Sequence, residues 1–119
     1  MTSLKGKTMN TIVLLDNIKK VCQENSISEA TNALAIELAN KLPDWLPTPS
    51  VYYYEPDGIE LEWVKYVDRF LLITVSDDGY MVHSRLNRYE TATFTHAGMN
   101  DENLPAVVVD WLWEYRNST

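Results

Sequence analysis

Two glutamates, Glu60 and Glu62, are the residues whose type and spacing most directly suggest acid–base chemistry. They stand two positions apart in an alternating segment, so both carboxylates point to the same face of an extended strand. Paired carboxylates act as general acid and general base when burial separates their pKa values. Val64 and Tyr66 follow on that face and do not indicate a deep site, so a solvated strand face is the favoured interpretation.

The two histidines, His83 and His96, would approach each other if the strands that carry them pair across the turn at residues 87–89. A bound metal ion needs at least a third ligand, and no other residue stands at a recognisable spacing from them. Asp77 and Asp78 lie at the opposite end of the fourth predicted strand. We therefore predict surface histidines and no metal site.

Nucleophile and phosphate-binding motifs are incomplete. Cys22 falls on the apolar stripe of a predicted helix, where a thiol packs as a small hydrophobic group. The triplet Gly6-Lys7-Thr8 resembles the end of a phosphate loop, but the upstream glycine and the preceding strand are missing. We predict no catalytic residue and no cofactor. A small enzyme or ligand-binding domain with a pocket between sheet and helices stays open as an alternative.

Tyrosines and acids gather in the strand-forming region. Side chains alternate along a strand, so Tyr52 and Tyr54 point one way and Tyr53 the other, and at least one face carries exposed tyrosine. Exposed tyrosine is a common interface anchor, although sheets also favour aromatic residues for packing alone. The predicted partner-binding residues are Tyr52, Tyr53, Tyr54, Glu55, Asp57, Glu60, Glu62 and Tyr66.

Five strands are predicted to position these residues, at 51–54, 59–66, 69–76, 79–86 and 90–95. Ile59, Leu61 and Trp63 alternate with glutamates, which is typical of a half-buried strand. Asp57-Gly58 and Asp78-Gly79 are hairpin turn signals, because glycine accepts a positive φ. These runs predict an antiparallel meander of about four to five strands.

Helices are predicted before and after the strands. Apolar residues recur at helical spacing over 11–23, and a second helix follows from its cap at Ser28 to Pro43, with a buried face of Ala30, Ala33, Leu34, Leu38 and Leu42. A last helix is predicted at about 102–116. The fold class is therefore α+β, with an N-terminal helical pair and a C-terminal helix packed on one sheet face.

The composition indicates one domain. The chain has 119 residues, 45% of them hydrophobic, and its 17 acids against 10 bases leave a net charge of −7. We assign residues 9–119 to a single domain and set 1–8 aside as a flexible N-terminal extension or a tag remnant. The lone Cys22 favours a reducing, cytoplasmic location. There is no apolar run of about 20 residues, so no membrane partner is expected.

The segment LPTPSVYYYEPDGIELEW, with FLLITV and DDGY after it, carries a resemblance. Over about residues 43–115 the chain resembles small uncharacterised bacterial proteins with a proline-rich lead-in, a Pro-Asp-Gly turn and a Leu-Glu-Trp strand. It differs in having Ile59 directly after one glycine and in its tyrosine run, where such proteins have small polar residues. The resemblance implies the strand order and the final helix, and no activity. It rests chiefly on Pro56, Asp57, Gly58, Leu61, Glu62 and Trp63.

The expected function is non-catalytic protein–protein binding. The acidic charge repels nucleic acid but suits a basic partner, such as the nucleic-acid groove of another protein. The profile is that of inhibitors, antitoxin-like proteins and phage or mobile-element anti-defence factors such as anti-CRISPR proteins. The alternatives are the ligand-binding domain or enzyme described above, and a homodimeric structural protein joined through the tyrosines or an edge strand. The chain is expected to be a monomer or a homodimer.

Overall fold

Two capped helices begin the fold. The computed structural model describes residues 9–86, 91–96 and 103–116, and in it α1 spans Thr11–Asn25 and α2 spans Glu29–Lys41. The side chain of Asn10 accepts the N–H of Val13 at 3.1 Å, and the hydroxyl of Ser28 accepts the N–H of Thr31 at 3.2 Å. These bonds satisfy helical N–H groups that would otherwise have no partner. The predicted helical pair and the Ser28 cap are confirmed.

The strands form one antiparallel sheet in the order in which they occur along the chain. They are β1 (Ser50–Tyr54), β2 (Gly58–Tyr66), β3 (Arg69–Ser76), β4 (Gly79–Arg85) and β5 (Thr91–His96). Gly79 has a φ of 134°, which side chains other than that of glycine rarely allow, so the predicted Asp-Gly turn is present there. The predicted meander is confirmed.

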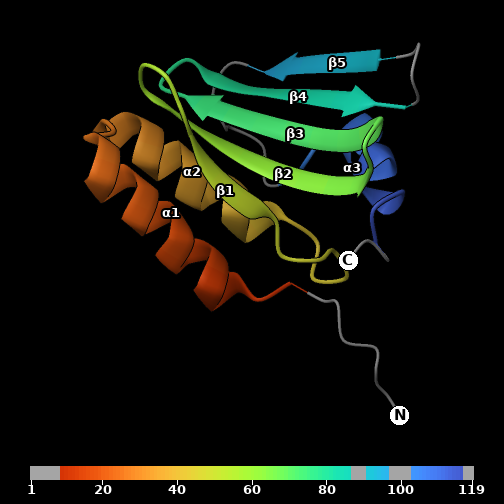
Figure 1. Cartoon of the computed structure of the whole chain (residues 1–119), viewed down its shortest axis with the longest axis horizontal. Coiled ribbons are helices and arrows are strands. Elements are labelled where there is room, and N and C mark those ends of the chain that lie inside the picture. Colours follow the sequence, from red (N-terminus) through yellow and green to blue (C-terminus); the bar gives the residue numbers. More distant parts are fainter. Residues whose placement is uncertain (1–8, 87–90, 97–102, 117–119) are drawn as a thin grey trace.

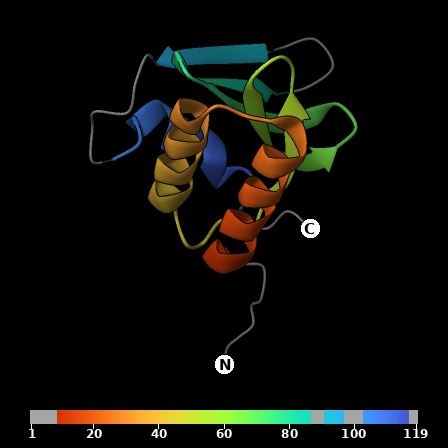
Figure 2. The same cartoon turned by 90° about the vertical axis from the view of Figure 1, so that its left-hand side faces the viewer.

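The helices lie together on one side of the sheet (Figures 1 and 2). The third helix, α3, spans Ala106–Trp113 and contributes Val108 and Leu112 to the core. Alternate residues of β2, β3 and β4 are buried on this side, as the alternating pattern requires. The α+β class predicted from the sequence is therefore confirmed. The buried sheet residues on this side are Ile59, Leu61, Trp63, Leu71, Ile73, Val75, Tyr80 and Val82.

The proline-rich connector between α2 and β1 is part of the core structure. The indole N–H of Trp63 donates to the carbonyl of Pro47 at 2.7 Å, and Leu46 is buried. Trp45 packs edge-on against Trp113 with ring centroids 4.9 Å apart. The connector therefore holds β2 and α3 to the N-terminal helices.

Two helix predictions were wrong in detail. The buried residues of α2 are Thr31, Ala35, Leu38 and Ala39, whereas Ala30 and Ala33 are exposed. Thr31 faces inward because its hydroxyl donates to the carboxylate of Asp57 at 2.9 Å. The last helix begins only after Pro105, which occupies its N-cap, and it is shorter than predicted. Proline disfavours a helical conformation in the residue before it, so residues 103 and 104 stay outside the helix.

Candidate functional site

The side of the sheet that faces away from the helices is the candidate surface, and we call it the open face. None of the three helices covers it in the described part of the chain. It combines aromatic, aliphatic, hydroxyl, acidic and basic side chains. From β1 to β5 its residues are Ser50, Tyr52, Tyr54, Glu60, Glu62, Val64, Phe70, Leu72, Thr74, Ser76, Met81, His83, Arg85, Thr91, Thr93 and Thr95.

The tyrosine run is divided between the two faces of the sheet. Tyr52 and Tyr54 lie on the open face and are 47% and 48% exposed. Tyr53 points to the helix side, and its hydroxyl donates to the carbonyl of Pro56 at 2.9 Å. The open face therefore presents two tyrosines from β1, and the third supports the turn after the strand.

The predicted glutamate pair lies in the middle of the open face. Glu60 is flanked by Tyr52 on β1 and Thr74 on β3, and Glu62 by Ser50 and Leu72. Partial burial among these neighbours raises the pKa of Glu60, and the negative charge of Glu62 raises it further. Both carboxylates are half-buried, and neither makes a hydrogen bond or ion pair within the described residues. They form an acidic spot among tyrosine, hydroxyl and aliphatic side chains.

Two hollows lie at opposite ends of the open face, and neither is lined by the glutamate pair. One, of about 370 Å³ beside the β3–β4 turn, has Tyr54 and Met81 in its wall and Asp78 at its turn. The other, of about 640 Å³ beside the β2–β3 turn, is lined by Tyr66, Val67, Asp68, Phe70 and Arg85. Both are open to solvent, so they can receive a protruding side chain but do not enclose a small molecule.

The remaining predicted site residues lie away from this centre. Tyr66 is 63% exposed at the end of β2, next to the larger hollow. Glu55 is exposed in the β1–β2 turn. Asp57, in the same turn, accepts three hydrogen bonds from Ser28 and Thr31, and those from Ser28 are the main reason that its pKa is lowered. The structure thus brings together Tyr52, Tyr54, Glu60 and Glu62, and it gives Asp57 a structural role.

Sequence reasoning missed the apolar part of the open face. Phe70 and Leu72 alternate with the buried residues of β3, and Met81 continues this apolar surface on β4. Their signal was present: β3 has apolar residues on both of its faces, which a strand with one solvated face does not require. The open face is therefore more apolar than the acids and tyrosines alone suggested.

The residues considered for metal or nucleophilic chemistry do not converge. His83 lies on the open face with its Nδ1 3.4 Å from the Thr93 hydroxyl, while the side chain of His96 lies outside the described residues. Cys22 is half-buried, its thiol lies 3.2 Å from Oδ1 of Asn32, and burial raises its pKa. Over 9–86, 91–96 and 103–116, no group of three His, Cys, Asp or Glu could hold a metal ion. The Gly6-Lys7-Thr8 triplet lies outside the described residues.

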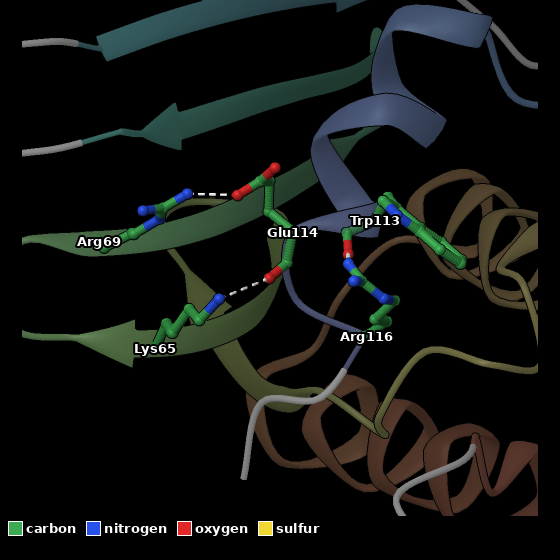
Figure 3. Close-up of polar contacts among 5 residues, drawn as sticks. All are labelled: Lys65, Arg69, Trp113, Glu114 and Arg116. Atoms are coloured by element: carbon green, nitrogen blue, oxygen red, sulfur yellow. Dashed lines mark hydrogen bonds and ion pairs between the residues drawn. The ribbon is translucent and has the colours of Figure 1, made fainter.

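A basic cluster on the helix side has a structural explanation (Figure 3). Lys65 donates to the carbonyl of Glu114 at 3.2 Å, and Arg69 forms an ion pair with the Glu114 carboxylate. Arg116 donates to the carbonyl of Trp113 at 2.7 Å and stacks over its ring at 4.3 Å. Lys65 and Arg116 thus donate to carbonyls at the end of α3, where the helix dipole favours positive charge. The cluster fastens α3 to the β2–β3 hairpin.

Comparison with known proteins does not identify the open face. No protein family, curated protein or solved structure matches this chain. No helix in the described part of the chain has the length and apolar character to cross a membrane.

Proposed function

We propose that the protein acts without catalysis, by binding a basic surface of another protein through its open face. The observation that carries this proposal is a complete side of a five-stranded sheet that none of the described helices covers and that exposes Tyr52, Tyr54 and Met81 around Glu60 and Glu62. Contiguous apolar surface with a polar surround is typical of interaction sites. Tyrosine adds large contact area at a small cost in side-chain entropy.

The residues of the Pro-Asp-Gly and Leu-Glu-Trp motif also support the open face as the binding surface. Asp57 holds the α2 cap, Gly58 has no room for a side chain, Leu61 is buried and Trp63 bonds the connector. Glu62 differs, because it lies on the open face without a hydrogen bond or ion pair among the described residues. A structural role accounts for these four residues, whereas Glu62 is available to a partner.

Charge points to a basic partner. The protein carries a net charge of −7, and Glu60, Glu62 and Asp78 outnumber Arg85 on and beside the open face. A basic groove that normally holds nucleic acid is complementary to this arrangement, with the carboxylates in place of phosphates. Occupying such a groove would inhibit the partner, as antitoxin-like and anti-CRISPR-like proteins do. That comparison rests on the overall profile and not on a shared site.

The smaller hollow adds an anchor for the partner. Its tyrosine wall, from Tyr54, and the Asp78 carboxylate suit a lysine or arginine side chain, whose aliphatic stem packs on the ring while its charge meets the acid. The alternative of a ligand pocket between sheet and helices is less favoured. Among the described residues, buried side chains from the sheet and the helices pack together in that region.

The test compares two double charge reversals in the full chain used as bait in a lysate of its native host. Glu60→Lys/Glu62→Lys alters the open face, and Asp16→Lys/Glu24→Lys alters exposed positions on α1. Each reversal adds two units of charge, so both variants change the net charge from −7 to −3. Captured proteins are identified by mass spectrometry, and their affinities are measured again with purified components.

The proposal predicts a captured protein with a basic surface. The open-face variant should lose about tenfold or more in affinity and have a weaker salt dependence. The α1 variant should bind nearly as the wild type does. Equal affinity of the two variants, or capture of a partner without a basic surface, would refute the proposal.

A further inference from the structure

β5 lies at one end of the strand order, and in the described part of the chain no further strand is paired with its outer side. On its inner edge β5 pairs with β4 from Arg85↔Thr91 to Tyr80↔His96. Its outer edge therefore presents a row of backbone N–H and C=O groups, which is a template for another strand.

The sequence of β5 lacks the usual protection of an edge strand. The segment TATFTH contains no Asp, Glu, Lys, Arg or proline, and its pairing with β4 has no bulge. At the other edge of the sheet, α1 packs against β1, and Pro47 and Pro49 directly precede that strand. Natural proteins protect an edge with charges, prolines, bulges or a covering element. β5 is therefore the edge at which another strand can be added.

The side chains of β5 are complementary to themselves. In an antiparallel pair of two β5 strands centred on Thr93, each Thr91 faces Thr95 of the other copy, and each Ala92 faces Phe94. The three threonines lie on the open face, and Ala92 and Phe94 lie on the helix side. Threonine pairs stabilise neighbouring strands, and a small residue opposite a large one avoids overpacking.

Neighbouring registers fit less well. A centre at Phe94 would bring the two phenylalanine rings face to face, and a centre at Ala92 would pair only residues 91–93 of the described strand with one another. If the axis passed between two residues of β5, the open face of one copy would continue into the helix side of the other copy. The register centred on Thr93 also pairs all of residues 91–95 without placing a charged side chain against another. The absence of facing charges favours this register, because two chains that each carry a net charge of −7 repel each other.

We propose that β5 pairs antiparallel with β5 of a second copy about a two-fold axis at Thr93. The two five-stranded sheets then form one continuous sheet, and the two open faces lie side by side as one wider surface. Such an interface is isologous and closes on itself, so it produces dimers and not fibres. The interface is also short, so the fraction of dimer should rise with protein concentration. This proposal does not depend on the identity of any partner.

Disulfide trapping tests the register. Thr93→Cys in a Cys22→Ser background places the two introduced thiols opposite each other on the axis, within the Cα separation that a disulfide spans. The matched controls are Thr91→Cys and Thr95→Cys in the same background. In a dimer made of one control variant only, the two introduced thiols would lie roughly 13 Å apart along the strands, which is too far for a disulfide bond. After mild oxidation we expect covalent dimers from Thr93→Cys alone and from a mixture of the two control variants.

Mass in solution tests the dimer without a new cysteine. Light scattering over a concentration series should give a rising mass for the wild type and a monomer mass for Thr93→Lys, in which two lysines face each other on the axis. The Tm of a dilute, monomeric sample should be similar for both. The proposal is overturned if the wild type stays monomeric at the highest concentration, or if the three single-cysteine variants form covalent dimers equally or not at all.

Discussion

The carboxylate of Asp57 holds Ser28, the residue that caps α2, from 29 positions away in the sequence. One oxygen accepts the Ser28 backbone N–H at 2.7 Å and the other accepts the Ser28 hydroxyl at 2.7 Å. The β1–β2 turn is thereby joined to the start of α2, and the open face is oriented relative to the helices behind it. Asp57 therefore supports the residue that caps α2.

Removing this carboxylate should weaken the fold. We expect Asp57→Ala to lower the Tm by roughly 5 °C, because the cap of α2 and the attachment of the turn are both lost. Circular dichroism melting measures this change. Asp77→Ala, at an exposed position in the β3–β4 turn, is the matched control and should melt nearly as the wild type does.

The Asp57 effect should also depend on pH. The pKa of Asp57 is lowered below its ordinary value of 3.8, so its ionised form stabilises the fold. That contribution is complete above the ordinary value and is lost as the pH falls through the lowered pKa. The Tm difference between wild type and Asp57→Ala should therefore be constant near neutral pH and shrink in strong acid. A difference that grows on acidification would contradict the assigned role.

Gly58 should not tolerate a side chain. A Cβ atom there would lie 2.9 Å from the carbonyl oxygen of Tyr54 and 3.1 Å from that of Val75, both of them backbone atoms. We expect Gly58→Ala to lower the free energy of unfolding by about 1–3 kcal/mol, measured by urea denaturation. Ser50→Ala, at an exposed position of the same hairpin, should change it by less than about 0.5 kcal/mol. Equal effects at both positions would show that the close approach at Gly58 is not real.

Glu60 should destabilise the free protein at neutral pH. The pKa of Glu60 is raised above its ordinary value of 4.5, so the folded state favours the protonated carboxyl group. Ionisation of Glu60 therefore lowers the stability of the fold. This loss is complete above the raised pKa and absent below the ordinary value of 4.5. Glu60→Gln should raise the Tm by roughly 1–2 °C at pH 7, and this gain should disappear on acidification toward pH 4. Glu24→Gln, on the exposed surface of α1, should show no such gain. A Glu60→Gln variant that melts below the wild type at pH 7 would contradict the assigned environment.

Much of the fold could be predicted because its local signals agree. Each central strand packs one face on the core, so Ile59, Leu61 and Trp63 alternate with polar residues, and Asp78-Gly79 marks a turn that requires a positive φ. The buried face of α2 could not be predicted so well, since its alanines distinguish the sides of the helix poorly. The contact from Asp57 that turns Thr31 inward joins residues far apart in the sequence.

The candidate site could be predicted only in part. Alternation was enough to place Tyr52 and Tyr54 on one face and Tyr53 on the other. It could not decide which face the helices cover, because Phe70 and Leu72 are as apolar as the residues that alternate with them. Nor could it separate Asp57 from Glu62, since both are acids in one motif and only tertiary contacts distinguish a cap from a free carboxylate.

Radical footprinting of the complex tests the binding role of the open face most directly. Hydroxyl radicals oxidise exposed tyrosine, methionine and tryptophan side chains, and the exposed ones lie on both sides of the sheet. If the open face binds the partner, the complex should protect Tyr52, Tyr54 and Met81 severalfold and leave Tyr53 and Trp113 as reactive as in the free protein. Protection of Tyr53 and Trp113 with Tyr52 and Tyr54 still reactive would contradict this binding role.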